Sequence, residues 1–251
     1  MTAQIKEEAK LFRLEKYFGP YMAKIIIPEK ILHSLQKMTN KIIQDPGSNS
    51  HGSKLIGRIE KELTLSNSNF EEAGASYFLQ NCVSTYVLNC AKAVNKANEN
   101  IQIKTGITSA WVNSQYEHEY NPLHNHVNSG DEISGVFYLK CPDFTGRRDL
   151  KNKGKKNDLD GQITFVYDGH ADRFKSIFER GFLHYSPLAG DMFIFPSYLL
   201  HSVNPFIGKE ERRSVAFNAT YQITEKRDKD KYLIAGNKDF SERMESIYFY
   251  K

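Results

Sequence analysis

Cysteine is scarce in this sequence, and long apolar runs are missing. Only Cys82, Cys90 and Cys141 occur among 251 residues, and no Cys-x-x-Cys pair is present. An odd number at this spacing argues against a disulfide framework and a zinc ribbon, and favours a reducing, cytoplasmic location. Nowhere does the chain hold the roughly 18 consecutive apolar residues of a membrane-spanning helix. The first residues also lack the apolar stretch of a secretion signal, so we expect neither secretion nor a membrane span.

A strong charge of either sign is missing as well. The 34 Lys and Arg side chains exceed the 30 Asp and Glu side chains by only four, and the surplus is scattered. Electrostatics therefore predicts no nucleic-acid partner and no membrane surface. The length fits one elaborated β-rich domain, residues 1–251, better than two ordinary domains, and the sequence has no repeats.

Residues 1–100 have mainly helical patterns. PEKILHSLQKMTNKII begins with Pro28 and spaces its apolar residues along one face, which predicts an amphipathic helix. FEEAGASYFLQNCVSTYVLNCAKAVNKA repeats this pattern over a longer span. We expect these helices to flank the core of the protein.

Residues 101–223 change to short β-rich runs separated by turn residues, such as ISGVFYLKC and DMFIFP. The predicted fold class is α+β with a mainly β core, a sandwich or jelly-roll barrel flanked by the N-terminal helices. DFTGRRDLKNKGKKNDLDG is interpreted as a solvated Lys-rich loop, with a substrate-gripping lid as the minor alternative. Residues 224–251 form a charged tail. Its apolar end, IYFYK, is expected to dock on the core or on another subunit, which leaves a homodimer open.

Two histidines stand one residue apart in HNHVNSGDEISGVFYLK, residues 124–140. Side chains on a strand share a face at every second residue, so His124 and His126 are placed to bind one metal ion. His201, in GDMFIFPSYLLHSVNPF, supplies a third ligand from a distant strand. Such a set leaves positions open for substrate and oxygen, as a catalytic site requires. The alternative is that these are ordinary hydrogen-bonded histidines.

Arg212 stands in ERRSVAFNATY, eleven residues after His201. On a strand it shares a face with Ser214, Ala216 and Asn218, whereas Arg213 points outward on the other face. An arginine above small and polar side chains suits a ligand carboxylate, which its guanidinium can bind through two parallel hydrogen bonds. The opposite assignment of the two faces remains an alternative.

Two further residues are candidates for the same pocket. Tyr138, in VFYLK, carries a hydroxyl that could reach the same carboxylate. Asn113 is expected to border the pocket, and Trp111, on the same strand face, is either a neighbour of the pocket or part of the core.

These blocks together resemble the iron(II)/2-oxoglutarate-dependent oxygenases, most closely a branch related to the prolyl hydroxylases. The resemblance rests on SAWVNSQY, HNH…ISGVFYLKCP, PLAGDMFIFPSYLLHSVNPF and ERRSVAFN, and it covers about residues 105–222. It implies a double-stranded β-helix that uses Fe(II), 2-oxoglutarate and O2. It also implies that His124 and His201 are iron ligands, and that Arg212 binds the distal carboxylate of 2-oxoglutarate with help from Tyr138.

The sequence departs from the wider superfamily at one ligand, because His126 stands where His-x-Asp motifs have an aspartate. Either the site consists of His124, His126 and His201, or a carboxylate from Asp131 or Glu132 reaches the metal. We favour the three histidines, because the branch that the chain resembles also reads His-x-His. The resemblance leaves the prime substrate unknown; kinship with prolyl hydroxylases favours a protein or peptide side chain.

Two rival functions use the same residues. In a cupin-type enzyme, which needs no 2-oxoglutarate, His124, His126 and Glu132 would form the first part of the motif and His201 the second. In a non-catalytic binding module, the histidines would hold a structural zinc ion, which normally has four protein ligands. Arg212 discriminates, because a cupin has no use for a carboxylate clamp after the distal histidine.

Overall fold

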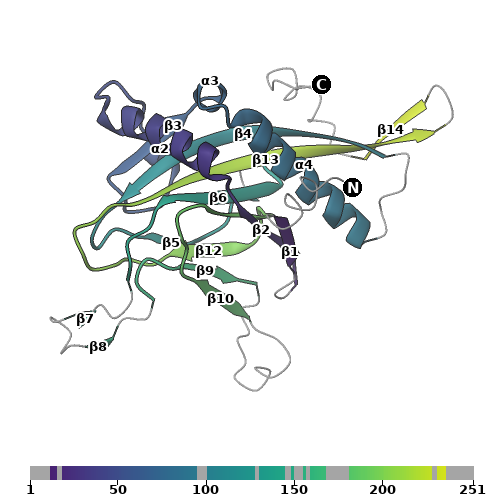
Figure 1. Ribbon diagram of the computed structural model, residues 1–251. Helices are drawn as coiled ribbons and strands as arrows, with labels where there is room; N and C mark the ends of the chain where they lie inside the picture. Colours follow the sequence, from purple (N-terminus) through teal and green to yellow (C-terminus); the bar gives the residue numbers. More distant parts are fainter. Residues whose placement is uncertain are drawn as a thin grey trace.

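The computed structural model describes residues 12–15, 19–94, 101–127, 130–144, 148–149, 155–156, 159–167, 181–227 and 231–235. In this part of the chain, two facing antiparallel sheets form the double-stranded β-helix that the sequence predicts (Figure 1). The larger sheet runs in the order β1 (Phe12–Glu15), β2 (Met22–Ile26), β11 (Asp191–Pro196), β6 (Ile133–Lys140), β13 (Arg212–Arg227), β4 (Ile101–Gln115) and β3 (Lys61–Leu65), with β14 (Lys231–Ala235) paired to β13. The smaller sheet runs in the order β10 (Phe182–Tyr185), β9 (Ile163–Val166), β12 (Leu200–Val203) and β5 (Asn121–His124).

Helices cover the outer face of the larger sheet (Figure 1). They are α2 (Glu29–Gln44), α3 (Asn67–Glu72) and α4 (Ser76–Ala93), with a short 3-10 turn, η1 (Gly52–Lys54), before β3. The helix predicted from Pro28 is confirmed as α2. The second predicted helix is divided into α3 and α4 at Gly74, whose φ of 65° is a left-handed conformation that glycine adopts without strain. None of the described helices is long and apolar enough to cross a lipid bilayer.

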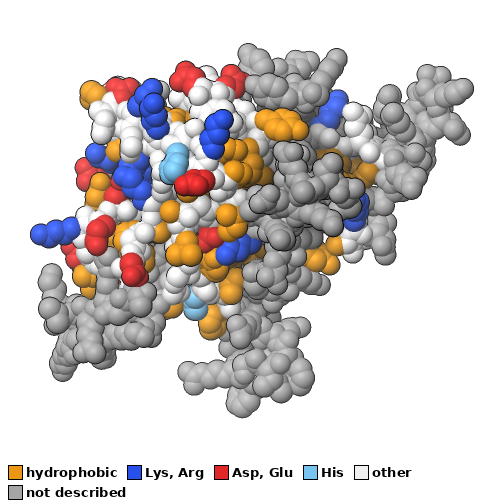
Figure 2. Space-filling view, viewed as in Figure 1, with side chains coloured by type: hydrophobic (Ala, Val, Ile, Leu, Met, Phe, Trp, Pro, Cys, Tyr) orange, Lys and Arg blue, Asp and Glu red, His pale blue; other side chains and the backbone are white. Residues whose placement is uncertain are grey.

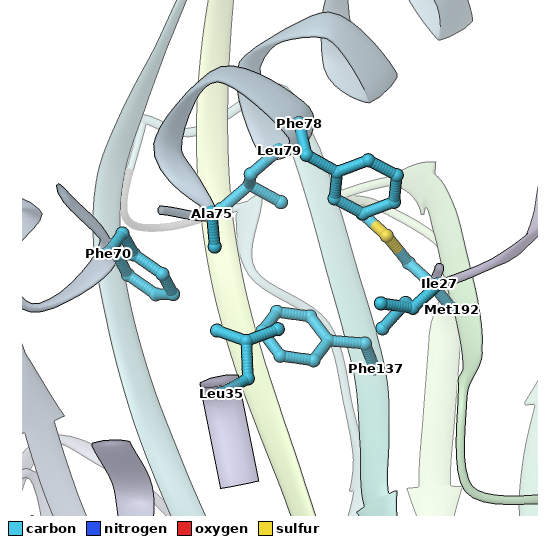
Figure 3. Close-up of a pocket in the computed structure, with 8 residues that line it drawn as sticks. All are labelled: Ile27, Leu35, Phe70, Ala75, Phe78, Leu79, Phe137 and Met192. Atoms are coloured by element: carbon cyan, nitrogen blue, oxygen red, sulfur yellow. The ribbon is translucent and has the colours of Figure 1, made fainter. Parts of the chain in front are cut away.

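A small apolar cavity lies where the helices meet the sheet. Leu35 of α2 and Leu79 of α4 converge on Phe137 of β6 (Figure 3). The complete lining consists of Ile27, Leu35, Phe70, Ala75, Phe78, Leu79, Phe137 and Met192. Its apolar walls belong to the main hydrophobic core and offer no polar group to a ligand.

The strands alternate their side chains between this core and the interior between the sheets. On β13, Val215 and Phe217 pack in the helix-side core, whereas Tyr138 of the neighbouring β6 packs in the second cluster, between the sheets. Register places Ser214 opposite Tyr138, and Arg212, Ser214, Ala216 and Asn218 therefore share the interior face. This is the assignment that the strand pattern favoured.

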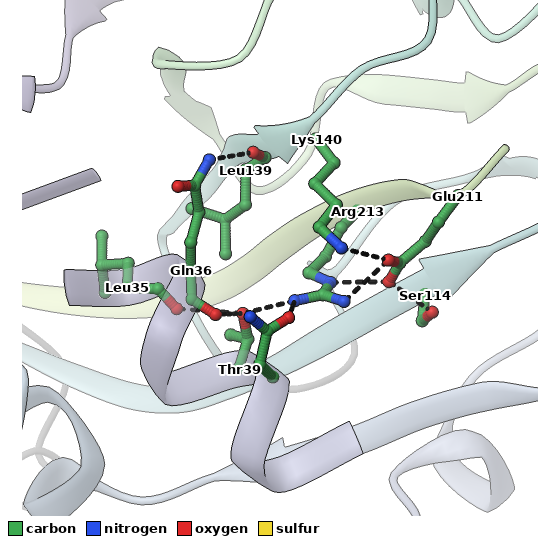
Figure 4. Close-up of polar contacts among 9 residues, drawn as sticks. Leu35, Gln36, Thr39, Ser114, Leu139, Lys140, Glu211 and Arg213 are labelled. Carbon is green, nitrogen blue, oxygen red and sulfur yellow. Dashed lines mark hydrogen bonds and ion pairs between the residues drawn. The ribbon is translucent and has the colours of Figure 1, made fainter. Parts of the chain in front are cut away.

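Arg213 faces away from the interior, on the face that the strand pattern favoured. It is only 3% exposed, because α2 covers it. Its guanidinium donates to Glu211 at 2.6 and 2.7 Å, to Asn40 at 2.6 Å and to Thr39 at 3.1 Å (Figure 4). Burial alone would raise the pKa of Glu211, but hydrogen bonds from Arg213, Lys140 and Ser114 lower it to about 2. The hydrogen bonds to Thr39 and Asn40 connect α2 to the sheet, and the ion pair with Glu211 orients the guanidinium that makes them.

Two predicted boundaries differ from the structure. The β core does not begin at residue 101, because β2 and β3 from the mainly helical region belong to the larger sheet. Their pairing with β11 and β4 is non-local, and short strands carry little periodicity of their own. The tail does not begin at residue 224, because β13 continues to Arg227 and pairs with β14.

Other expectations concern the surface and the segments outside the sheets. In the Lys-rich insertion, β7 (Arg148–Asp149) pairs with β8 (Lys155–Lys156). The end IYFYK lies outside the described residues. On the face shown in Figure 2, Lys and Arg side chains alternate with Asp and Glu side chains, which matches the scattered charge of the sequence.

Candidate metal and cosubstrate site

Three histidine side chains meet at one end of the interior. His124 ends β5, His126 follows two residues later, and His201 stands on β12 directly opposite His124. One ligand atom from each ring lies within 4.8 Å of the others. The ring centroids of His124 and His201 are 4.2 Å apart, and that of His126 lies 5.2 Å from each. The structure thus brings together the three histidines that the sequence selected.

Backbone carbonyl groups orient two of the rings. Nδ1 of His124 lies 2.7 Å from the carbonyl oxygen of Pro122, and Nδ1 of His201 lies 2.9 Å from that of Leu199. A carbonyl oxygen only accepts hydrogen bonds, so Nδ1 of each ring carries the proton and Nε2 keeps its lone pair. The backbone N–H of His126 donates to the Ser197 carbonyl at 2.9 Å, which fixes the chain beside the other two ligands.

The pKa values of all three imidazoles are shifted downward. Burial lowers the pKa of His201 well below its ordinary value, and the nearby His124 and His126 lower it further. Burial and then His124 lower the pKa of His126 to about 4, against an opposing hydrogen bond with Asn218. Burial also lowers the pKa of His124. The rings are therefore neutral at pH 7, the protonation state that binds a metal ion.

The two acidic alternatives hold other partners. Oδ1 of Asp131 accepts from the Thr108 hydroxyl at 2.5 Å. Oε2 of Glu132 accepts from the Thr220 hydroxyl at 2.7 Å and from the Tyr221 N–H at 3.1 Å. Neither carboxylate joins the histidine cluster. The donor set present, three neutral imidazoles, suits a divalent transition metal such as iron and leaves coordination positions for other ligands.

Arg212 is a buried cation on the same interior face as Ser214 and Asn218, and only 1% of it is exposed. Its Nε donates to the Gly161 carbonyl at 3.0 Å, and its Nη1 donates to the side-chain oxygen of Gln115 at 3.0 Å. Both acceptors are neutral, and Nη2 has no hydrogen-bond partner among the described residues. Since burying an unpaired charge is costly, the open donor suits a carboxylate from a ligand.

Tyr138 adds a second open donor beside Arg212. The guanidinium carbon of Arg212 lies 5.1 Å from the centre of the Tyr138 ring. The Tyr138 hydroxyl is buried, and its one polar neighbour is the Arg212 guanidinium, which can only donate to its oxygen, so the hydroxyl hydrogen has no acceptor among the described residues. Burial raises the pKa of this phenol, although Arg212 opposes the shift, so the hydroxyl remains protonated and able to donate.

The remaining predicted residues, Asn113, Ser214 and Asn218, lie between the histidine cluster and the Arg212–Tyr138 pair. Ser214 stands opposite both Asn113 and Tyr138, and it lies between Arg212 and Asn218 along β13. Asn218 itself is occupied: it donates to Ser109 at 3.2 Å, accepts from Ser134 at 3.1 Å, and hydrogen bonds with His126. Its position suits support of a metal ligand better than direct contact with a cosubstrate.

Two neighbours of the site were missed from the sequence. Gln115, the partner of Arg212, shares a strand face with Trp111 and Asn113, and this parity was the available signal. His51 gave no signal, because it lies in a turn-rich segment far from the motif. Its ring stacks on Trp111 with centroids 4.7 Å apart, and Trp111 lies 6.0 Å from His126. Trp111 is thus both core and a neighbour of the site.

A family model described as "Putative 2OG-Fe(II) oxygenase" matches residues 109–218. This match confirms the resemblance drawn from the motifs. The matched region contains His124, His126, His201 and Arg212, so the part of the chain that builds the site is similar in sequence to 2OG-Fe(II) oxygenases. No curated protein matches the chain.

Several solved structures are similar to the chain at low identity. A Pseudomonas putida prolyl-4-hydroxylase is 13% identical with a TM-score of 0.48, over 86% of this chain and 96% of that one. The α-ketoglutarate-dependent epimerase SnoN from nogalamycin biosynthesis is 13% identical with a TM-score of 0.47, over 89% and 86%. EctD from S. alaskensis with bound Fe is 10% identical with a TM-score of 0.47, over 88% and 76%. Similarity this distant says nothing about the substrate.

Proposed function

We propose that this protein is an Fe(II)- and 2-oxoglutarate-dependent dioxygenase that hydroxylates a substrate. The observation that carries the proposal is the presence, in one interior, of three neutral imidazoles and a buried guanidinium with an open donor. When bound, Fe(II) would activate O2, the oxidant: oxidative decarboxylation of 2-oxoglutarate to succinate and carbon dioxide takes up one oxygen atom, and the other enters the substrate.

The chain's own residues would bind and orient the reactants. His124, His126 and His201 would hold the iron. Arg212 would bind the distal carboxylate of 2-oxoglutarate, with the Tyr138 hydroxyl as a second donor. With neutral ligands the iron keeps its full charge, so that a dicarboxylate is attracted at both of its ends.

We further propose a protein or peptide side chain as the hydroxylated group. The support is the resemblance to prolyl hydroxylases, which is an analogy of family and not an observation of this site. The cupin alternative is less well supported, because it needs Glu132 as a ligand and that carboxylate is bonded to Thr220 and Tyr221.

Binding of iron and 2-oxoglutarate tests the proposal directly. Fe(II) is added anaerobically to the purified chain, 2-oxoglutarate is titrated in, and the weak visible charge-transfer band of the chelated complex is followed. We expect a saturable band, succinate formation on admission of O2, and 2-oxoglutarate binding weakened at least tenfold in Arg212→Ala with iron binding retained.

Two outcomes would contradict the proposal. Stoichiometric iron without any band would favour a cupin-type enzyme, and no iron binding at all would favour a non-catalytic module. Arg212→Lys serves as the matched variant: it keeps the charge but loses the planar fork, and should therefore bind 2-oxoglutarate with intermediate affinity.

A further inference from the structure

Three buried oxygen atoms in the same interior lack hydrogen-bond partners among the described residues. They are Oε1 of Glu62, Oδ1 of Asn113 and Oδ1 of Asn121. Glu62 is 2% exposed and Asn113 is 7% exposed. Buried polar atoms are nearly always paired, so several unpaired acceptors in one region call for an explanation.

These oxygen atoms come from strands that meet at one seam of the barrel. Glu62 on β3 is the register partner of Asn113 on β4. Asn121 begins β5, at the edge of the smaller sheet. The residues that precede β3 and β5 are hydrogen bonded to each other, because the Arg58 N–H donates to the Tyr120 carbonyl at 2.8 Å.

Gly57 packs closely against two of the acceptors. A Cβ atom built on this glycine would lie 3.2 Å from Oε1 of Glu62 and 3.3 Å from Oδ1 of Asn121, which is tighter than an ordinary contact. The two oxygen atoms therefore lie on either side of one position, and a larger residue at position 57 would crowd both.

The acceptors lie on strands that also carry the histidine site and its neighbours. Asn121 and His124 are the first and last residues of β5. Asn113 shares its strand face with Trp111, whose ring centroid lies 6.0 Å from that of His126. Asn113 and Trp111 therefore connect Glu62 to the histidine cluster along one face of β4.

The charge of Glu62 is not balanced by a cation within the described part of the chain. Among the described residues no ion pair neutralises this carboxylate, and the nearest charge that affects it belongs to Glu119, which has the same sign. Burial, and then Glu119, raise the pKa of Glu62 to about 7. Buried carboxylates are normally paired, and an ionised carboxylate can only accept hydrogen bonds.

We propose that Glu62, together with Asn121, binds an ammonium or guanidinium group of the prime substrate and so selects cationic substrates. This inference rests on the proposed function, because it names the substrate class for that site. Asn113 is the register partner of both Glu62 and Ser214, so it stands between the cation position and the expected cosubstrate position.

The single tryptophan of the chain allows a binding test that needs neither iron nor 2-oxoglutarate. The fluorescence of Trp111 is followed while the full chain is titrated with n-butylammonium or methylguanidinium. The neutral analogues of the same size are n-butanol and N-methylurea. We expect a saturable response to at least one cation, and at least tenfold weaker binding of its neutral analogue.

Two variants and a control identify the binding group. Glu62→Gln should abolish the preference for the cation. Gly57→Ala keeps the charge but crowds Oε1 of Glu62 and Oδ1 of Asn121, so it should weaken cation binding at least fivefold. Glu60→Gln removes the same charge from an exposed position of the same segment and should bind like the wild type. Because both variants are tested, misfolding of Glu62→Gln would still leave Gly57→Ala decisive.

Each contrary result overturns the inference. These results are equal binding of cation and neutral analogue, no response to either cation, or unchanged cation binding in a folded Glu62→Gln or Gly57→Ala variant. A cation preference in a protein that forms no charge-transfer complex would remove the proposed function and leave the cation site. A charge-transfer complex without a cation preference would do the reverse.

Discussion

Replacing Glu62 with glutamine should stabilise the protein at neutral and alkaline pH. The side chain is 2% exposed, and its pKa is raised from 4.5 to about 7. In the unfolded chain this carboxyl ionises at its ordinary pKa, so between these two pH values the unfolded state releases a proton that the folded state retains. Stability of the wild type is therefore lost as pH rises through this window.

The size of the effect follows from the two pKa values. At about 1.4 kcal/mol per pH unit, the interval from 4.5 to about 7 corresponds to roughly 3 kcal/mol. This is an upper estimate, because water entering the seam would reduce it. Glutamine has nearly the same shape but does not ionise, so Glu62→Gln should match the wild type near pH 4.5 and exceed its stability by up to roughly 3 kcal/mol near pH 8.

Urea unfolding followed by circular dichroism at several pH values between about 4.5 and 8 measures this difference. Glu60→Gln, at an exposed position, should stay within about 0.5 kcal/mol of the wild type. A stability difference between Glu62→Gln and the wild type that does not change with pH would refute the reasoning, because it would mean that Glu62 has a hidden partner or is hydrated.

Three further variants test the rest of the site and its support. His201→Ala should abolish stoichiometric iron binding measured by metal analysis, and iron retained at one equivalent would remove it from the ligand set. Arg213→Met removes the hydrogen bonds from β13 to Thr39 and Asn40 of α2, while Lys140 still pairs with Glu211, and should lower the free energy of unfolding by about 1.5–3 kcal/mol; a loss below about 0.5 kcal/mol would show that these hydrogen bonds do not hold α2. Asp131→Asn combined with Glu132→Gln should leave iron affinity nearly unchanged, because both carboxylates form hydrogen bonds outside the histidine cluster. A large loss of iron affinity would show that one of the two carboxylates is a metal ligand.

Local sequence patterns were enough to predict the β core and to select the three histidines. The period of two along RRSVAFN is a property of any strand, and it separated Arg212 from Arg213 before any pairing was known. His126 lies just beyond the end of β5, where the hydrogen bond of its N–H to Ser197 keeps it beside His124. The order of the four sequence blocks along the chain then indicated the resemblance to the iron(II)/2-oxoglutarate-dependent oxygenases. What these patterns specify is which residues share a face, and this was the information that the site required.

The pairing of distant strands could not be predicted in the same way. β3 is five residues long, and its alternation of Glu62 and Thr64 with Leu63 and Leu65 is equally typical of an exposed edge strand. Only its pairing with β4 turns Glu62 into the interior, and only the seam with β5 brings Asn121 beside it. His51 reaches Trp111 through a turn in the same non-local manner.

The interior and its helix-covered outer face each contain a buried arginine and a glutamate. One arginine–glutamate pair stabilises the fold, and the other two residues are available to bind ligands. Arg213 is buried and forms a complete ion pair with the partly buried Glu211, and the hydrogen bonds to Glu211 lower its pKa to about 2. Arg212 and Glu62 are equally buried, yet each keeps an open polar atom, and the pKa of Glu62 is raised to about 7. The satisfied pair lies under α2 and the unsatisfied residues line the interior. Because unpaired buried charges destabilise a fold, this division supports an interior shaped for ligands that bring the missing charges, a carboxylate for Arg212 and a cation for Glu62.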